Sequence, residues 1–282
     1  MSTQTEIEVS YDIDNEFFRL WLDKAMNYTC GVHDGVETEE EAQRQKLVWL
    51  SNAARVTPSK RVLEIGCGWG ACLAHLVTEC KIKEAHGITL SKAQYDEVLR
   101  RNLPGITVSH CSYLDFKPDK KFDAIISIGM LEHIVTAEQG RLGKHIDIYR
   151  NYFKLTHEWT NPGSWFGLHH IITIQIPRNK KDLQDLVWTV RTIFPGAYSP
   201  RIEDVIMNLH PYWELMEIRT RRLDYAKTTA EWHRRLCVHE TLIRKQWGDR
   251  VFENYDRYLQ ACVRLFERNN FSLAQYALRR LD

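Results

Sequence analysis

The first segment that could do chemistry is glycine-rich, Glu64-Ile65-Gly66-Cys67-Gly68-Trp69-Gly70, and it directly follows an apolar run. Glycine has no Cβ, so the backbone can turn sharply and come close to a ligand. Where such a turn joins a strand to a helix, free N–H groups at the start of the helix face that ligand. The segment therefore predicts a nucleotide-type cofactor, lined by Gly66 and Gly68.

Two kinds of cofactor fit this turn. Residues 66–71 match the dinucleotide pattern Gly-x-Gly-x-x-Gly/Ala, which normally has an acidic residue at the end of the second strand to hold the ribose. Here the second apolar run ends at Thr89, and Glu84 stands near its start. Residues 64–70 also match Glu-x-Gly-x-Gly-x-Gly, the first motif of methyltransferases that use S-adenosylmethionine (SAM). An NAD-dependent oxidoreductase and a non-catalytic SAM sensor stay open at this point.

The elements that must position this turn alternate along the chain. Apolar runs that favour strands and amphipathic runs that favour helices occupy, in order, 61–66, 69–80, 84–90, 91–103, 106–112, 122–130, 140–156 and 165–176. Ser91 is expected to be an N-cap. Strands and helices that alternate at this spacing predict an α/β fold. The sheet should be doubly wound and mostly parallel, Rossmann-like, as in class I SAM methyltransferases.

The remaining chain flanks or interrupts this alternation. Residues 1–57 look helical, with candidate helices at 15–22 and 39–54, and are expected to form a lid over the methyltransferase domain, 58–282. A proline-containing stretch near 177–211 is expected to be an insertion that binds the acceptor. After it we expect a strand at 212–222, two long helices within 226–268 that meet at Trp247-Gly248, and a last strand at 271–278.

Composition excludes several classes. The 38 Lys and Arg nearly balance the 37 Asp and Glu, so nothing predicts binding to nucleic acid. No apolar stretch approaches the roughly 20 residues of a membrane span, and the polar N-terminus does not look like a secretory signal. Seven cysteines, an odd number, suggest reduced thiols and a cytoplasmic location. Because the chain contains no Cys-x-x-Cys pair, we expect no metal site.

A second motif narrows the type of methyltransferase. Gly87-Ile88-Thr89-Leu90-Ser91-Lys92-Ala93-Gln94 resembles the Gly-Leu-Thr-Leu-Ser-x-x-Gln stretch of the cyclopropane fatty acid synthases and mycolic acid cyclopropane synthases. In that family the Thr and the Gln stand in for the ribose-binding acid. Further segments resemble the family in the same order along nearly the whole chain, at 11–18, 26–30, 62–70, 127–133, 168–171 and 224–232. The resemblance implies methyl transfer from SAM to an alkene carbon of an apolar acceptor, such as a free or carrier-bound unsaturated acyl chain.

The chain also departs from the family pattern. Leu131 stands where a Phe is common, Asp224 replaces a His of the mycolic acid enzymes, and 179–210 matches only at Phe194-Pro195-Gly196. The extra N-terminal domain of the phospholipid-acting synthases has no counterpart in this sequence. These departures fall where an acceptor would be selected. A C- or N-methyltransferase of a small natural product or a prenyl diphosphate therefore stays open as an alternative.

The resemblance implies a base as well. Methylation of an alkene leaves a cation that must lose a proton, and the family is known for a bound bicarbonate ion that takes it. Carried over to this sequence, the residues that hold the ion are Cys30, Glu132, His169 and Tyr225, with the backbone of Ile171. Each has a structural alternative when taken alone: a buried thiol, a cap of a strand-to-helix turn, a core histidine, a surface aromatic.

The SAM contacts implied by the resemblance come from five segments. They are Tyr28 and Thr29 at the carboxylate end, Gly66 and Gly68 at the methionine part, Thr89, Leu90 and Gln94 at the ribose and adenine, Ser112 and Tyr113 over the adenine, and Ile128 on the floor of the cleft. An apolar acceptor is also compatible with peripheral contact at a membrane. The sequence holds no signal of oligomeric state.

Overall fold

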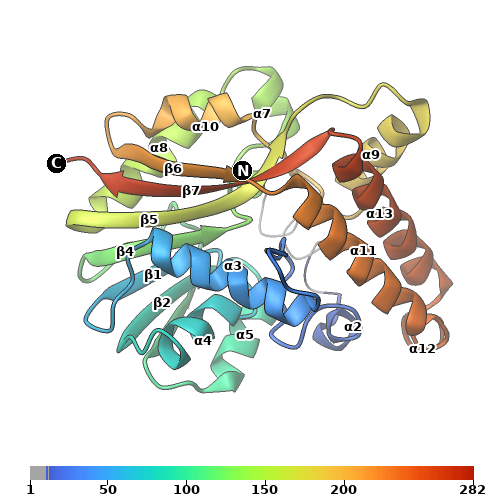
Figure 1. Cartoon of the computed structure of the whole chain (residues 1–282), viewed down its shortest axis with the longest axis horizontal. Coiled ribbons are helices and arrows are strands. Elements are labelled where there is room, and N and C mark those ends of the chain that lie inside the picture. The colour runs from blue at the N-terminus through green and yellow to red at the C-terminus, as the bar shows by residue number, and fades with distance from the viewer. Residues whose placement is uncertain (1–10, 12) are drawn as a thin grey trace.

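The computed structural model describes residue 11 and residues 13–282, and a seven-stranded sheet runs through its middle (Figure 1). The strands are β1 Arg61–Ile65, β2 Glu84–Thr89, β3 Ile106–His110, β4 Phe122–Ile128, β5 Thr160–Thr173, β6 Trp213–Thr220 and β7 Phe271–Arg280. Their spatial order is β3-β2-β1-β4-β5-β7-β6. The first five are parallel, whereas β7 runs antiparallel to both of its neighbours. The prediction of a doubly wound, mostly parallel α/β fold of the class I SAM methyltransferase type is confirmed.

Helices cover both faces of the sheet and one end of it. They are α2 Asn15–Arg19, α3 Glu39–Ala53, α4 Ala71–Thr78, α5 Lys92–Arg101, α6 Leu131–Ile134, α7 Ala137–Arg141, α8 His145–Glu158, α9 Lys180–Thr192, α10 Ile202–Leu209, α11 Arg222–Val238, α12 Glu240–Trp247 and α13 Asp249–Glu267. In Figure 1, α3, α4 and α5 lie on one side of the sheet and α8 and α10 on the other. The helices α9 and α11 to α13 extend beyond one end of it.

Apolar burial explains this arrangement. One core cluster joins β1, β4 and β5 to α8 and α10, and contains the buried rings of Tyr152, Phe166 and Trp213. A second joins α2 to α11 and α13 through aromatic residues such as Phe17 and Trp232. Because the aromatic second cluster ties the N-terminal segment to the C-terminal helices, both ends of the chain help to enclose one end of the sheet.

The breaks between helices differ from expectation at Gly143 and at His239, and agree with it at Gly248. The helix expected at 140–156 is split at Gly143, whose φ is +72°, into α7 and α8. The break expected at Gly248 is present, with a φ of +91°, because few residues other than glycine adopt such a conformation. A further break, at His239, was not expected, so this part of the chain forms three helices instead of two. The N-cap at Ser91 is confirmed, since the Gln94 amide donates to its hydroxyl over 3.1 Å.

The two flanking regions take defined shapes. The proline-containing stretch forms α9 and α10, joined by a loop that carries Phe194. The expected lid contributes α2 and α3, and α3 packs against β5 and β7. Residues 1–10 and Asp12 of that lid lie outside the described residues. The lid boundary at residue 57 and the role of the insertion stay predictions.

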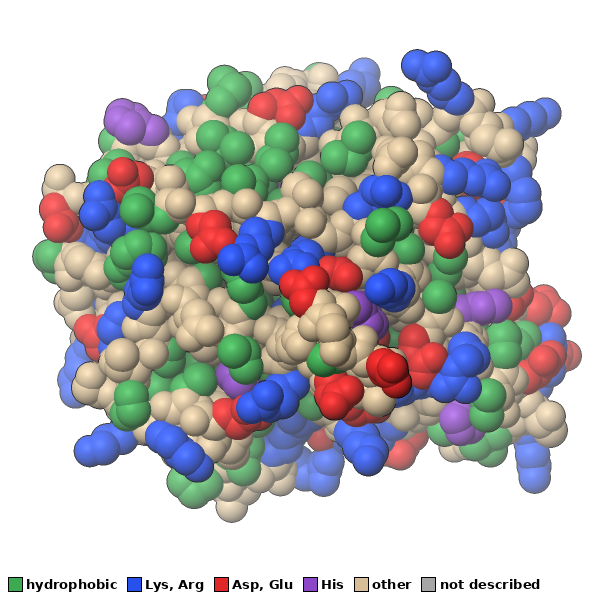
Figure 2. Space-filling view, viewed as in Figure 1, with side chains coloured by type: hydrophobic (Ala, Val, Ile, Leu, Met, Phe, Trp, Pro, Cys, Tyr) green, Lys and Arg blue, Asp and Glu red, His purple; other side chains and the backbone are tan. Residues whose placement is uncertain are grey.

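On one face of the molecule the charged side chains are spread widely, whereas exposed apolar side chains gather in one region. Figure 2 shows Lys, Arg, Asp and Glu spread over one face, and hydrophobic side chains gathered over the region of α8 and α10. Ile146 of α8 and Ile206 and Met207 of α10 are among the exposed apolar residues there, Met207 at 70%. Within the described part of the chain, no helix combines the length and apolar character that crossing a membrane requires.

Candidate functional site

The glycine turn begins where β1 ends. Gly66, Gly68 and Gly70 have φ values of +76°, +53° and +83°, which side chains with a Cβ rarely adopt. A Cβ on Gly70 would lie 2.9 Å from a methyl carbon of Val98, so this glycine lets α5 pack closely. A Cβ on Gly68 would meet no described atom within 4 Å. Gly68 therefore faces open space, and its missing side chain leaves room for a ligand instead of for the protein.

A cavity of about 960 Å³, partly open to solvent, lies at this turn. Its walls come from the segments that follow β1, β2, β3 and β4, and from the N-terminal region. Nine of the ten residues predicted to contact the cofactor line it, namely Tyr28, Thr29, Gly66, Gly68, Thr89, Leu90, Gln94, Tyr113 and Ile128. Ser112 lies next to the wall, where its hydroxyl accepts from the Leu114 amide over 3.2 Å. The carboxyl ends of parallel strands thus form one binding cavity.

The sequence has no acidic residue at the end of β2. The hydroxyl of Thr89 and the side-chain amide of Gln94 lie there instead. The Thr89 hydroxyl donates to the side-chain oxygen of Gln94 over 2.8 Å, and both residues are buried. The Ser91 amide donates to the same hydroxyl over 3.2 Å. These bonds fix both side chains at the wall of the cavity, so a polar ligand meets preorganised groups there.

Two charged residues of the cavity wall were not predicted as contacts. Lys46 of α3 is fully buried, and its ammonium donates to Asn27, Thr29 and Gln43 over 3.0, 2.8 and 2.6 Å. No carboxylate forms an ion pair with it among residues 11 and 13–282. Sequence reasoning missed Lys46 because a single lysine in a helix with many charges has no distinguishing pattern.

Glu64 is the acidic counterpart of Lys46 in the same cavity. Glu64 is the next-to-last residue of β1 and the first residue of the glycine motif, and it was not predicted to contact the cofactor. Burial raises the pKa of Glu64 to about 8, and the positive charge of Lys46 opposes the rise. One carboxylate oxygen has no hydrogen-bond partner among the described residues. The wall therefore presents a buried cation and a buried acid that are not paired with each other.

The four residues predicted to hold the base are Cys30, Glu132, His169 and Tyr225. We call them the buried polar group. Their exposures are 0%, 6%, 0% and 7%. Glu132 lies in α6, just after β4, and His169 lies within the neighbouring strand β5, where it pairs with Ile128 of β4. None of the four lines the cavity, and no hydrogen bond joins any two of them in the described structure. Their chain neighbours Thr29 and His133 do line it, so the group lies just behind the cavity wall.

Glu132 is held by one oxygen only. The Ile171 amide donates to Oε1 over 2.7 Å, whereas Oε2 is buried without a partner among the described side chains and backbone. Burial raises the pKa of Glu132 to about 7, and the bond from Ile171 opposes the rise. A carboxyl group with this pKa can gain or lose a proton near neutral pH, as general acid–base chemistry requires. The Ile171 amide, expected to hold an ion, binds Glu132 here.

His169 is oriented by a residue that was not predicted. The side-chain amide of Gln275 lies 3.3 Å from His169 Nδ1, and Arg221 donates to the Gln275 oxygen over 3.3 Å. An amide nitrogen only donates, so Nδ1 accepts and the ring proton sits on Nε2. That Nε2 is buried and has no partner in the part of the chain described. Burial keeps the pKa of His169 well below its usual range, so the ring is neutral.

Cys30 and Tyr225 complete the group from the aromatic core. The Cys30 thiol donates to the Gly31 carbonyl over 3.0 Å, and burial raises its pKa. Tyr225 stacks on Phe266 with ring centroids 4.4 Å apart. Burial raises the pKa of Tyr225, and the charges of Cys30 and Glu132 raise it further. Tyr225 therefore lies close enough to Cys30 and Glu132 to feel their charges, although no hydrogen bond joins any two of the four residues in the described structure.

Aromatic rings pack against one another at the wall of the cavity. Phe194, from the loop between α9 and α10, lies 6.0 to 6.3 Å from the rings of Tyr11, Tyr28 and His133. The Tyr11 hydroxyl is 2.9 Å from His133 Nε2, and burial lowers the pKa of His133 to about 4. The predicted insertion thus reaches the back of the cavity wall, where Phe194 packs against three rings that line the cavity.

Comparison with known proteins agrees with this geometry. Residues 1–276 match the family described as mycolic acid cyclopropane synthetase. Cyclopropane mycolic acid synthase 2 of Mycobacterium bovis is 29% identical over 95% of this chain and 92% of its own. The cyclopropane-fatty-acyl-phospholipid synthase of Escherichia coli K12 is 28% identical over 96% of this chain, which spans 66% of that protein.

Solved structures show the same similarity in three dimensions. The cyclopropane synthase MmaA2 from Mycobacterium tuberculosis has a TM-score of 0.89, 26% identity and 98% coverage of both chains. The mycolic acid cyclopropane synthase CmaA1, in complex with SAH and CTAB, has a TM-score of 0.89, 25% identity and 99% coverage of both. Because the family model matches nearly the whole of this chain, the chain belongs to the mycolic acid cyclopropane synthetase family of SAM-dependent methyltransferases.

Proposed function

We propose that this protein transfers the methyl group of SAM to an alkene carbon of an unsaturated acyl chain, with a proton removed at the buried polar group. The observation that carries the proposal is the position of that group. It lies directly behind a cavity whose wall holds nine of the ten predicted cofactor residues. A cofactor site next to a buried, neutral-pH carboxyl group suits a reaction that needs both a methyl donor and a base.

The wall of the cavity supports SAM as the ligand. The methionine part of SAM carries one carboxylate and one ammonium, and the wall offers the buried ammonium of Lys46 and the buried carboxyl group of Glu64, which are not paired with each other. Because the Thr29 hydroxyl oxygen accepts from Lys46, its own proton is left to donate to the SAM carboxylate. Thr89 and Gln94 would take the ribose, and Tyr113 the adenine. The related CmaA1 was crystallised with SAH, which is SAM without the methyl group.

The buried polar group fits a small oxyanion such as bicarbonate. Its partnerless atoms are Oε2 of Glu132 and Nε2 of His169. His169 Nε2 carries a proton and can donate, and Glu132 can donate when protonated. A bound bicarbonate would supply a base for a carbon-bound proton. Glu132 and His169 would hold it, Cys30 and Tyr225 would close the site, and their burial would keep water out.

The acceptor is argued from the rings around the cavity. Tyr11 and Tyr28 line the cavity and Phe194 packs against both rings, so an alkyl chain that binds beside Tyr11 and Tyr28 loses contact with water. The CmaA1 complex also contained CTAB, an alkyl-chain detergent. The exposed Ile206 and Met207 of α10 offer an apolar surface for contact with the lipid that carries the acyl chain.

The proposal is tested by incubation with SAM labelled in its methyl group and one acceptor at a time. The acceptors are a monounsaturated phospholipid in vesicles, its saturated analogue, a prenyl diphosphate and a small amine, and products are identified by mass spectrometry. We expect label only in the unsaturated lipid, with a mass gain of one CH₂. Label in the amine or in the prenyl diphosphate instead would overturn the acyl acceptor and support the alternative methyltransferase.

The base is tested with Glu132→Gln. We expect SAH affinity to stay unchanged and turnover to fall by roughly 10², the usual scale for a lost general base. Removal of carbon dioxide should slow the wild type, and added bicarbonate should restore its rate. If Glu132→Gln kept full turnover, the buried polar group would be structural and the proton would leave by another route.

A further inference from the structure

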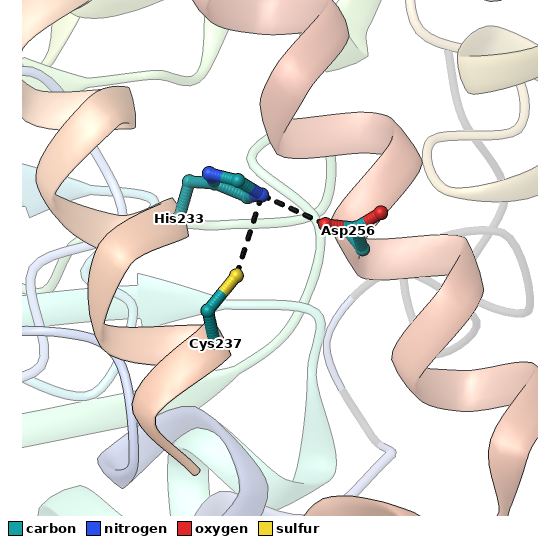
Figure 3. A group of neighbouring side chains, drawn as sticks. All are labelled: His233, Cys237 and Asp256. Carbon is teal, nitrogen blue, oxygen red and sulfur yellow. Dashed lines mark hydrogen bonds and ion pairs between the residues drawn. The ribbon is translucent and has the colours of Figure 1, made fainter. Parts of the chain in front are cut away.

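A second cluster of ligand-type side chains lies between α11 and α13 (Figure 3), and none of its residues lines the cofactor cavity. His233 and Cys237 are four residues apart on α11, so both project from the same face of the helix. Asp256 faces them from α13. His233 Nε2 is 2.8 Å from Asp256 Oδ1 and 3.5 Å from Cys237 Sγ, and the three ligand atoms all lie within 4.8 Å of one another.

The convergence on one nitrogen is informative. A neutral imidazole has a single N–H, and a proton on Nε2 can point well at only one of two neighbours. The carboxylate and the thiol both approach that same Nε2. A cation between the three atoms would satisfy all of them at once, because each is a good ligand for a soft or borderline metal.

The chain contains a matched cluster that does not converge. His75 has Cys80 Sγ at 3.5 Å from Nε2, but Glu79 lies 3.4 Å from Nδ1, the other ring nitrogen. Its thiol and carboxylate therefore sit on different sides of the ring. Within the described residues, only the His233 cluster brings three such ligand atoms together. Residue types alone do not make the site; their arrangement does.

The distances suit Zn²⁺. Zinc binds Cys sulfur at about 2.3 Å and His nitrogen or Asp oxygen at about 2.0 to 2.2 Å, so ligand atoms around a tetrahedral ion are roughly 3.3 to 3.6 Å apart. The sulfur–nitrogen distance of 3.5 Å already fits. The nitrogen–oxygen distance of 2.8 Å has to open by about half an ångström, and the sulfur–oxygen distance, which lies within 4.8 Å, has to reach about 3.5 Å, so the partly exposed Asp256 side chain has to turn when the ion binds.

Access and support are also present. The His233 and Asp256 side chains are 28% and 31% exposed, so an ion can enter from solvent. The side-chain amide of Gln260 donates to both oxygens of Asp256, over 2.9 and 3.0 Å, and steadies the carboxylate. Such outer contacts commonly orient metal ligands. Three protein ligands leave a fourth position for water.

We propose that His233, Cys237 and Asp256 form a Zn²⁺ site that ties α11 to α13. Binding replaces the thiol proton of Cys237 with the metal and releases that proton to solvent. The bridged helices carry Trp232 and Tyr255, which pack in the aromatic cluster at the end of the sheet. The metal would therefore stabilise the helices that enclose this end. A Cys-x-x-Cys search overlooks it, because the site contains a single cysteine and its third ligand comes from another helix.

The test uses the full chain, treated with a chelator and titrated with Co²⁺ as a coloured substitute for Zn²⁺. We expect one equivalent to give a near-ultraviolet thiolate-to-cobalt absorption band, which Zn²⁺ abolishes by displacement. Cys237→Ser should lose the band, and His233→Gln and Asp256→Asn should weaken Co²⁺ binding at least tenfold. Zn²⁺ should raise the Tm of the wild type and not that of Cys237→Ser.

The matched control is Cys80→Ser, which removes the thiol of the non-convergent cluster and should keep the band and the affinity. Circular dichroism in the presence of chelator checks that each variant is folded. A wild type without the band, a band that survives Cys237→Ser, or a band lost in Cys80→Ser would overturn the proposal. These readouts need no methyl transfer, so they stand apart from the proposed activity.

Discussion

The cofactor cavity and the buried polar group lie side by side but are built differently. The cavity is made by short segments that follow consecutive strands, and its central feature is backbone: glycines with positive φ that leave open space. The buried polar group gathers four side chains from distant parts of the chain, and burial shifts their pKa values. The cavity therefore binds its ligand through the shape of the backbone, and the buried polar group acts through side chains that are shielded from water.

This difference predicts different failures. A change in the cavity should alter binding and spare folding, because the space it uses belongs to the ligand. A change in the buried polar group should alter proton transfer and the pH dependence of stability, because the folded state holds these groups in unfavourable surroundings. Three variants test this difference, in addition to the turnover measurement on Glu132→Gln.

The largest effect is expected for Gly68→Val. The new side chain would meet no protein atom within 4 Å, so it should project into the cavity and block SAH from binding. Calorimetry should detect no saturation. The control is Gly143→Val, an exposed glycine with a φ of +72° and equally open surroundings, which carries the same backbone strain of about 1 to 2 kcal/mol. Unchanged SAH affinity in a folded Gly68→Val variant would contradict the assignment of the turn.

A second effect concerns stability and pH. The pKa of Glu132 is about 7 in the folded protein and about 4.5 when unfolded, so between these values the folded state binds more protons. The free energy of unfolding therefore falls as pH rises through this window, by on the order of 3 kcal/mol for this one group. Glu132→Gln removes the group.

Urea unfolding of the wild type and of Glu132→Gln at pH 5 and pH 8 measures this effect. The wild type should lose stability relative to the variant at the higher pH. Glu64, with a pKa of about 8, titrates in both proteins, so its contribution cancels in the difference. An equal pH dependence in the two proteins would mean that Glu132 is not held in a desolvated site.

The smallest effect is expected for Lys46→Gln, which keeps a hydrogen-bond donor and removes a charge. We expect SAH affinity to fall about tenfold, as for the loss of one partly screened charge pair. Binding of methylthioadenosine, which lacks the amino-acid part, should stay the same. Lys24→Gln, at an exposed lysine, controls for net charge. If both ligands weakened equally, Lys46 would support the fold and not the carboxylate.

Much of the cofactor site could be predicted because its determinants are local. The motif at 64–70 and the pair Thr89 and Gln94 lie within single strand–turn–helix units, so spacing in sequence is nearly spacing in space. Lys46 could not be found in this way. Its relation to the cavity depends on how α3 packs against the sheet and the N-terminal segment, which no local pattern encodes.

The order of strands and helices along the chain, the glycine turn and the residue types at the strand ends can all be predicted from the sequence, because each follows from backbone geometry and apolar periodicity over short stretches. The folded structure is needed to find which charges are unpaired, which ring nitrogen of His169 carries the proton and which thiol meets a histidine and a carboxylate. Those properties depend on burial and on the direction of side chains from separate elements. Gln275 beside His169, and Asp256 beside His233, come together only when the chain folds.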